Sequence, residues 1–396
     1  MVSTSLTGNR DLIRAINNSL ILNEIKNRGP IPRAELARIT GLSPATVTSI
    51  VAELIDEKLV FEKEYGNSSG GRRPILLSLN PRGGYVVGLK ISFDQIVGAL
   101  TDLRAEIIAR YDVSLTTKDP SSVVRILADI VDRLVAQAGI SRSSLLGVGV
   151  GMAGIVDSNQ GLLRWSPFFG WRDLPLRDLI QLQVGVPVYI DNNEKSLSLA
   201  EKWFGTGRQF NNFLVIAIGN GVGMGIVVNG QYYNGAHGGA GEVGHTLIDP
   251  DGPPCMCGKQ GCVEAYLANY SLLREVNLAL QHDELSQTIQ TTTQLYRMAE
   301  LGDPTVISIL NRAGKVLGRV LANLINIFNP QCIILTGEAM QFSPWQMQQV
   351  NEMIEKYAMP NLREGVKITI EPWDNTMWAR GAASLVLRRL FNPPIT

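Results

Sequence analysis

Apolar residues recur every three to four positions over residues 9–28, which is the period of an amphipathic helix. A Gly-Pro pair at positions 29 and 30 ends this helix, because proline has no amide hydrogen to continue it. The pattern favours a second helix over 32–41. Ser43-Pro44 then favours the start of a third, with serine as the cap and proline in the first turn. The chain therefore begins with three closely spaced helices.

The spacing of the second and third helices is typical of a helix-turn-helix unit, whose second helix enters the DNA major groove. On this interpretation the third helix is the recognition helix. Its start and exposed face carry small hydroxyl groups that reach bases or phosphates. The predicted DNA contacts here are Ser43, Thr46, Thr48 and Ser49.

Two short strands are expected at 59–65 and 75–79, with the sequence GNSSGGRRP between them. A Gly/Ser loop with paired arginines at the tip of a hairpin is typical of the wing of a winged helix. Arg72 and Arg73 are therefore predicted to contact phosphate or enter the minor groove. The alternative is an ordinary three-helix domain with a surface loop. The formal net charge of the chain is zero, which by itself indicates no polyanionic partner.

Strands and helices alternate over the rest of the 396-residue chain. Strand-like runs at 85–92, 96–103 and 106–113 predict an antiparallel meander, and an amphipathic helix follows. A second group of predicted strands followed by helices spans residues 213–330. This pattern predicts an α/β fold with two lobes. We assign a winged-helix domain to 1–82, a first lobe to 83–190 plus 376–396, and a second lobe to 191–375.

A glycine-rich stretch joins two of the predicted strands in the second lobe. It reads Gly219-Asn220-Gly221-Val222-Gly223. A strand follows these glycines, whereas a dinucleotide-binding fingerprint requires a helix there. We interpret the stretch as a tight hairpin, with phosphate binding as the alternative.

Three of the four cysteines fall within eight residues and follow a histidine in the pattern H-x9-C-x-C-x4-C. Zn²⁺ prefers four sulfur and nitrogen ligands in a tetrahedron, and a Cys3His set is one of its usual structural sites. Two glutamates flank the cluster, so a metal would hold two carboxylates in place. The predicted zinc ligands are His245, Cys255, Cys257 and Cys262. Scattered free thiols are the alternative.

Clustered thiols stay available for a metal under reducing conditions. No stretch reaches the ~18 apolar residues of a membrane span, and the N-terminal region has no signal-like apolar run. We therefore expect a cytoplasmic protein without a membrane partner.

Two motifs of the second lobe carry a family resemblance. G-x-A-G-E-x-G-H spans Gly238–His245, and C-x-C-G-x-x-G-C-x-E spans Cys255–Glu264. With these motifs the whole chain resembles the ROK family of repressors, open reading frames and kinases. The winged helix marks the repressor branch. The resemblance implies an actin-like fold of two lobes with a sugar in the cleft between them.

Site residues follow from the same resemblance, position by position. Those that match sugar-binding positions are Gly154, Asn192, Asn193, Glu242, His245 and Glu264. The four predicted zinc ligands match the zinc ligands of the family. Phe168 stands where the family often has an asparagine before a Gly-Trp pair. The sugar site of this chain therefore differs from the common pattern at this position, and the resemblance does not identify the sugar.

Three departures from the kinases of the family indicate that this chain has no catalytic residue. Asn193 replaces the aspartate that acts as general base, a group that typically contributes ~10²–10⁴-fold to rate. The strand at 88–94 lacks the D-x-G-x-T phosphate motif, and Glu338 replaces the second glycine of an adenosine motif. The zinc ion is expected to be structural, because four protein ligands leave no open position.

The sequence therefore predicts a non-enzymatic, sugar-responsive transcriptional repressor of carbohydrate metabolism genes. A homodimer, or a dimer of dimers, would read a pseudo-palindromic operator DNA, and a small-molecule sugar inducer would relieve binding. One alternative is an ATP-dependent sugar kinase with a fused DNA-binding domain. A second is a repressor regulated by a protein partner, with an empty sugar cleft.

Overall fold

The computed structural model describes residues 10–63, 74–92, 94–280, 288–339, 344–372 and 375–391. The chain divides into two compact units. The first unit comprises Met1–Met152, Pro175–Asp191 and Ala379–Thr396, and the second comprises Ala153–Leu174 and Asn192–Trp378. Among the described residues, no helix is long and apolar enough to cross a membrane.

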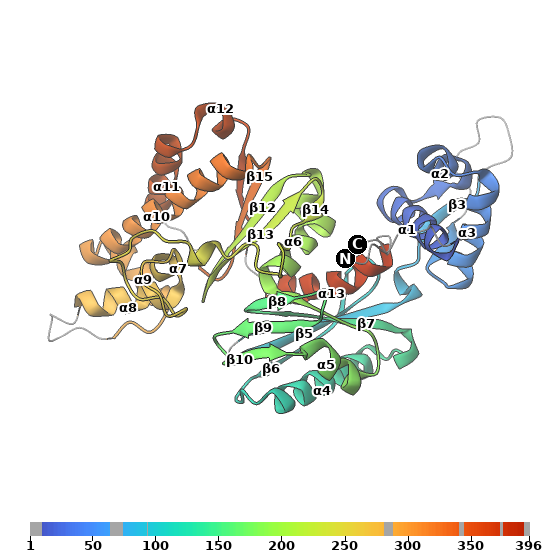
Figure 1. Ribbon diagram of the computed structural model, residues 1–396, viewed down its shortest axis with the longest axis horizontal. Helices are drawn as coiled ribbons and strands as arrows, with labels where there is room; N and C mark the ends of the chain where they lie inside the picture. The colour runs from blue at the N-terminus through green and yellow to red at the C-terminus, as the bar shows by residue number, and fades with distance from the viewer. Residues whose placement is uncertain are drawn as a thin grey trace, which may run out of the picture. The chain divides into compact units, whose positions relative to one another are not determined.

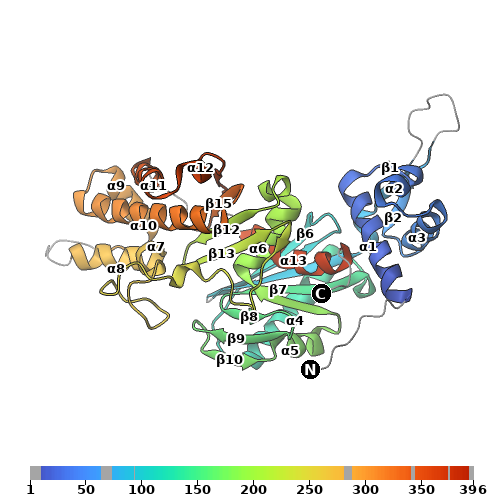
Figure 2. The ribbon, with the colours of Figure 1, turned by 45° about the horizontal axis from the view of Figure 1, so that its top comes forward.

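The first unit begins with a head of three helices on a small sheet (Figures 1 and 2). The helices are α1 (Arg10–Arg28), α2 (Arg33–Thr40) and α3 (Pro44–Asp56). The sheet has the order β1-β3-β2, from β1 (Ile31–Pro32), β2 (Val60–Lys63) and β3 (Leu76–Leu79). Its core includes Ile21, Leu36 and Val47, all fully buried. The three predicted helices are confirmed.

A five-stranded sheet with the order β11-β7-β4-β5-β6 forms the rest of the first unit. Its strands are β4 (Tyr85–Ile91), β5 (Gln95–Thr101), β6 (Ile107–Ser114), β7 (Leu145–Met152) and β11 (Val188–Asn192). Strands β4, β5 and β6 pair antiparallel, which confirms the predicted meander. The helices of this part are α4 (Pro120–Ala138), α5 (Leu176–Val184) and, from Ala379 on, α13 (Asn375–Phe391).

Helix α13 packs on this sheet through two glycines. A Cβ atom at Gly88 or at Gly149 would lie 1.8 Å from a carbonyl oxygen of the helix. Glycine therefore allows the helix backbone to approach the strands β4 and β7 directly. In the described part of the first unit, Ala379 of the helix is fully buried against Val97 and Ala99.

The second unit contains a five-stranded sheet with the order β14-β13-β12-β15-β16. Its strands are β12 (Phe213–Ile218), β13 (Val222–Val228), β14 (Gln231–Tyr232), β15 (Cys332–Thr336) and β16 (Lys367–Ile370). The helices are α6 (Asn193–Phe204), α7 (Glu264–Leu267), α8 (Asn269–Leu280), α9 (Thr292–Glu300), α10 (Pro304–Phe328), α11 (Pro344–Tyr357) and α12 (Pro360–Arg363). The largest apolar core lies between this sheet and α10.

Strands β12 and β13 pair antiparallel from Phe213↔Val227 to Ile218↔Val222, so the glycine-rich stretch is the predicted hairpin. Short 3-10 helices occur at Pro81–Gly83, Arg142–Ser144, Thr206–Gln209 and Val243–His245. They connect the longer elements.

A further sheet of three strands belongs to the second unit, although the prediction assigned its residues to the first lobe. The strands are β8 (Ile155–Asp157), β9 (Leu162–Ser166) and β10 (Trp171–Leu174). The Nδ2 of Asn192 donates a hydrogen bond of 3.1 Å to the Gly154 carbonyl just before β8. The Nδ2 of Asn234 donates one of 3.0 Å to Ser158. These long-range bonds group 153–174 with the second unit.

Candidate functional site

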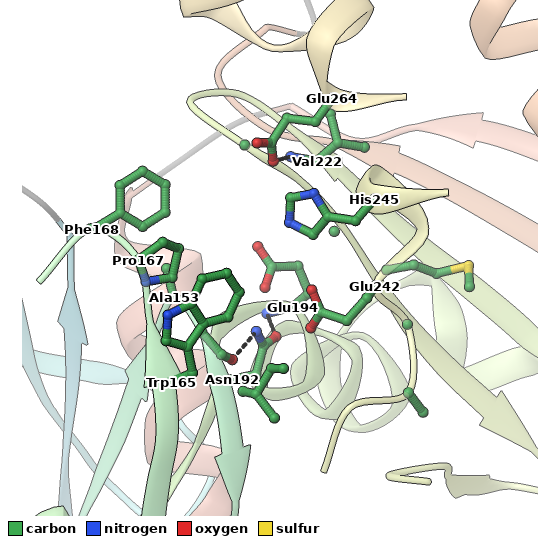
Figure 3. A pocket seen from close by; sticks show the side chains of 17 residues that line it. Ala153, Trp165, Pro167, Phe168, Asn192, Glu194, Val222, Glu242, His245 and Glu264 are labelled. Carbon is green, nitrogen blue, oxygen red and sulfur yellow. Dashed lines mark hydrogen bonds between the residues drawn. The ribbon is translucent and has the colours of Figure 1, made fainter. Parts of the chain in front are cut away.

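A pocket of the second unit brings together residues that lie far apart in the sequence (Figure 3). The space between its lining atoms is ≈ 580 Å³, and this volume includes open solvent. The polar side chains that line it are Asn192, Glu194, Glu242, His245 and Glu264. All of its lining residues belong to the second unit.

Five of the six predicted sugar-binding residues line this pocket. They are Gly154, Asn192, Glu242, His245 and Glu264. Asn193 is not among the described lining residues, and its side chain is buried elsewhere with an exposure of 6 %. The residue that reaches the pocket from the start of helix α6 is its neighbour Glu194.

Glu264 is a buried carboxylate held from two sides. Its Oε2 accepts a hydrogen bond of 3.1 Å from the backbone N–H of Val222 in the hairpin. Its Oε1 accepts one of 3.3 Å from the hydroxyl of Tyr270 and lies 3.6 Å from the Sγ of Cys255. Gly221 leaves room for this carboxylate, since a Cβ there would lie 3.1 Å from Oε2. The hairpin glycines therefore accommodate the acids of the pocket.

Glu242 lies directly before the 3-10 helix that carries His245. Within the described ranges its carboxylate has no hydrogen-bond partner. Burial raises the pKa of Glu242 to about 7, the charges of Glu194 and Glu264 add to this shift, and the charge of Lys195 partly offsets it. A group that donates hydrogen bonds to Glu242, or brings a positive charge, would remove this electrostatic cost.

Asn192 positions the start of helix α6. Its Oδ1 accepts hydrogen bonds from the backbone N–H groups of Glu194 at 2.9 Å and Lys195 at 3.4 Å, so it is the N-cap of the helix. Its Nδ2 donates to the Gly154 carbonyl. The predicted sugar-hydroxyl acceptor thus also ties α6 to the loop before β8.

An apolar wall faces the acids. Figure 3 shows Trp165, Pro167 and Phe168 on one side of the pocket, and His245 and the acids on the other. Trp171 lies outside the pocket lining and stacks on Phe169 with ring centroids 4.5 Å apart. Aromatic rings opposite hydrogen-bonding groups suit a ligand with an apolar face and polar edges.

A histidine–cysteine cluster lies beside the pocket. The possible ligand atoms of His245, Cys255, Cys257 and Cys262 all lie within 4.8 Å of one another, close enough to hold one metal ion. The Sγ of Cys255 is 3.7 Å from the Nδ1 of His245, and the Sγ atoms of Cys257 and Cys262 are 3.7 Å apart. The structure therefore brings together the four residues of the sequence pattern.

The cluster shares residues and contacts with the pocket. His245 belongs to both sets. Cys255 contacts the carboxylate of Glu264, and the hydroxyl of Tyr270 lies 3.9 Å from the Cys255 sulfur. Burial raises the pKa of Cys255 to about 12, so a bound cation is needed to keep these buried thiols deprotonated. A metal ion held by the cluster would therefore contact the pocket through His245.

Glu338 stands next to the hairpin turn, at the position where the kinases of the resembled family have a glycine. A Cβ atom built on Gly219 would lie 3.4 Å from the Cβ and from the Oε2 of Glu338. The side chain and its charge therefore occupy space beside the turn.

The predicted DNA contacts lie at the start of helix α3. The Oγ of Ser43 accepts a hydrogen bond of 3.1 Å from the N–H of Thr46, which makes Ser43 the N-cap. Thr48 and Ser49 are exposed, and Ser49 accepts a hydrogen bond of 3.4 Å from Arg14. The two predicted wing arginines, Arg72 and Arg73, lie outside the described residues.

The head and the pocket define a protein that joins a DNA-binding module to an α/β module able to hold a small polar molecule. The model of winged helix-turn-helix DNA-binding domains matches residues 14–60, and the ROK family model matches residues 86–389. The chain belongs to the ROK family. Its fold is a winged helix followed by an actin-like domain of the kind found in ROK sugar kinases.

Similar proteins match all or part of this chain. A xylose repressor of Bacillus spizizenii is 34 % identical over 380 residues, which cover 96 % of this chain and 97 % of that protein. A ROK family transcriptional regulator, a homologue of the E. coli MLC protein, has a structure with a TM-score of 0.86 at 27 % identity, covering 96 % and 97 % of the two chains. A ROK hexokinase of Thermus thermophilus has a TM-score of 0.65 at 26 % identity, with 76 % of this chain and 97 % of its own covered.

Sequence reasoning missed Glu194. The family pattern pointed to the two asparagines before it, and an acid in the first turn of a helix is common because it interacts favourably with the helix dipole. A signal was available in Gly223, where a Cβ atom would lie 2.6 Å from the Glu194 Cγ. The alternating glycines of the hairpin mark the places where carboxylates lie over the strand.

Proposed function

We propose that this protein is a sugar-responsive transcriptional repressor of carbohydrate metabolism genes. One observation carries the proposal: a single chain joins a winged helix-turn-helix head to a ROK domain whose pocket combines hydrogen-bond acceptors with an aromatic wall. Operator DNA is the partner of the head, and a sugar is the ligand of the pocket. The sites of the two partners lie in different parts of the chain.

Sugar recognition rests on the buried acids. The hydroxyls of the sugar donate hydrogen bonds to Glu242 and Glu264, and an apolar face of its ring lies against Trp165 or Phe168. A sugar whose hydroxyls do not meet these carboxylates leaves buried acceptors unpaired, which costs ~1–3 kcal/mol for each group. The pocket is therefore selective among sugars.

A zinc ion in the histidine–cysteine cluster would hold this pocket in shape. Tetrahedral zinc with Zn–S bonds of ~2.3 Å keeps its sulfur ligands roughly 3.8 Å apart, and the observed separation of the Cys257 and Cys262 sulfurs is 3.7 Å. The four residues fit the ion. Its role is structural, because four protein ligands complete the tetrahedron.

The chain acts by binding and not by catalysis. Asn193 has no basic oxygen and is not among the described lining residues of the pocket, and Glu338 lies beside the turn where a nucleotide would need a small residue. The remaining acids of the pocket serve as acceptors for the sugar. A coupled ADP-release assay over a panel of free sugars tests this point, and turnover above background would establish the kinase alternative.

The repressor binds its operator as a homodimer or a dimer of dimers, in the cytoplasm, where the operator is located and thiols stay reduced. Residues 1–82 form the DNA-binding domain, and the two lobes that follow form the sensor, with 153–174 in the second lobe. Sugar binding favours a conformation with lower operator affinity. By linkage this difference in the free energy of operator binding is typically about 1–3 kcal/mol, which corresponds to roughly 5–150-fold in operator affinity.

Operator release by a sugar is the decisive experiment. The full-length, zinc-loaded protein would be titrated against the DNA upstream of its own gene by fluorescence anisotropy, with and without each sugar of a panel that includes xylose. We expect a sugar of the panel to weaken DNA binding at least ~5-fold. Unchanged DNA binding with every sugar would favour regulation by a protein partner instead.

A further inference from the structure

One ion pair of the head joins helix α1 to the predicted recognition helix α3. The Nε of Arg14 in α1 donates a hydrogen bond of 3.1 Å to the Oε2 of Glu53 in α3, and its Nη2 pairs with Oε1 of the same carboxylate. The Nη2 also donates a hydrogen bond of 3.4 Å to the Oγ of Ser49, one of the predicted DNA contacts. An arginine from outside α3 therefore lies at the surface that α3 would present to DNA.

Both partners of this pair are accessible from solvent. The side chain of Arg14 is 53 % exposed and that of Glu53 is 36 % exposed. Water screens charges at such positions, so an exposed pair contributes little to the stability of the fold. Arg14 can therefore leave Glu53 at a small cost when another anion approaches the same surface.

A DNA phosphate is an anion of the right shape for this exchange. Arginine binds a phosphate as it binds a carboxylate, with two parallel N–H groups that donate to two oxygens. A recognition helix in the major groove brings the residues beside it close to the phosphates that border the groove. In the free protein, the carboxylate of Glu53 thus occupies the place on Arg14 that a phosphate would take.

We propose that Arg14 is a further DNA contact of the head, which binds a backbone phosphate in place of the carboxylate of Glu53. This assignment rests on the proposed function, since it adds a residue to the operator-binding surface of the repressor. Glu53 competes with DNA for Arg14 and so lowers the affinity of the head for DNA. Because a phosphate contact carries no sequence information, the competition acts alike on every DNA sequence.

A second arginine–glutamate pair in the same helix provides a matched control. Arg28 pairs with Glu24, four residues before it in α1. At 1.5 Å per residue, positions 14 and 28 lie about 21 Å apart along the helix axis. The pair at position 28 has the same chemistry but joins residues of one helix, so it does not connect α1 to α3.

Two substitutions with effects of opposite sign test the proposal. The full-length, zinc-loaded protein without sugar would be titrated by fluorescence anisotropy, over a series of salt concentrations, against the DNA upstream of its own gene and against a duplex of scrambled sequence. We expect Arg14→Gln to weaken binding to both duplexes by roughly 10-fold. The slope of log affinity against log salt concentration should become shallower by about 1, because one phosphate contact is lost.

Glu53→Gln should instead tighten binding to both duplexes, by up to about 5-fold, because Arg14 then has no carboxylate to leave. In the Arg14→Gln background the same change should have a smaller effect, since the carboxylate no longer has an arginine to hold. Arg28→Gln should leave the affinity for both duplexes nearly unchanged.

Three results would overturn the proposal. If Arg14→Gln and Glu53→Gln weaken binding by the same factor, the pair serves only to tie α1 to α3. A loss confined to the upstream DNA would identify a base contact, and an Arg14→Gln affinity equal to that of Arg28→Gln would remove Arg14 from the DNA surface. The proposed repressor function survives all three results, whereas a wild-type protein that binds neither duplex would contradict both.

Discussion

The recognition head and the pocket differ in how their functional residues are assembled. In the head, the candidate DNA contacts Ser43, Thr46, Thr48 and Ser49 lie within two turns of one helix, and three of the four side chains are exposed. In the pocket, the side chains come from loops and elements between residues 153 and 264 and are partly or fully buried. A surface on one helix needs little beyond a stable helix, whereas the pocket needs the whole unit to fold.

Burial also changes the energetics of the two sites. Hydroxyls on the head remain solvated until DNA arrives. The acids of the pocket lose water on folding, which raises the pKa of Glu242 to about 7. We therefore expect substitutions in the pocket to affect both stability and sugar binding, and substitutions on the exposed face of α3 to affect DNA binding alone. Four experiments test this difference.

Loss of the metal should have the largest effect. We expect Cys262→Ser to reduce the zinc content, measured by mass spectrometry, from about one ion per chain to nearly none, because the cluster then has three ligands. Sugar binding should be lost with it, since His245 and Glu264 lose their support. Cys332→Ser is the control, because Cys332 is buried in β15 away from the cluster. A variant that binds sugar normally without zinc would break the proposed coupling.

Removing one buried acceptor should have the next largest effect. In Glu264→Gln the side chain keeps its size but exchanges one oxygen for a donor group. We expect sugar affinity to fall on the order of 10–100-fold, the range for a lost hydrogen bond to a charged group. Isothermal titration with the inducing sugar measures it. Operator affinity without sugar should stay the same, and a fall in both affinities would contradict the separation of the two sites.

Substitution on the head should act on DNA alone. Thr48 is exposed, and its hydroxyl donates a hydrogen bond of 2.8 Å to the Pro44 carbonyl within the helix. We expect Thr48→Ala to weaken operator binding by roughly 10-fold, since one base contact is worth ~1–3 kcal/mol. Gel-shift titration measures this. Thr116→Ala, at an exposed threonine outside the head, serves as the control. An equal loss in both variants would argue against α3 as the recognition helix.

The last expected effect is a change in stability that depends on pH. The pKa of Glu242 is raised in the folded state, so its ionisation costs stability as pH rises from about 4.5 through 7. Glu242→Gln should therefore raise the melting temperature of the unliganded protein above pH 7. The corresponding gain in the free energy of unfolding is at most about 3 kcal/mol, and there should be no gain below about pH 4.5. A bound zinc ion reduces this gain. A variant with a lower melting temperature at every pH would show that the carboxylate is stabilising.

Sequence reasoning succeeded where the relevant interactions are local. The helix start at Pro44, the meander of β4 to β6 and the β12–β13 hairpin follow from periodicity and turn residues. Sequence reasoning differed from the structure where long-range contacts determine which unit an element belongs to. The hairpin sheet β8–β10 belongs to the second unit because of bonds from Asn192 and Asn234, which no local pattern announces.

The sequence by itself determined the histidine–cysteine cluster, because its four ligands lie within 18 residues and their spacing limits how they meet. The tertiary structure decided which residue of α6 lines the pocket. Neighbouring residues of a helix point about 100° apart, so the choice between Asn193 and Glu194 depends on how α6 is rotated against β13. Gly223 and Gly225 set that rotation by letting Glu194 and Ser198 pack directly over the strand.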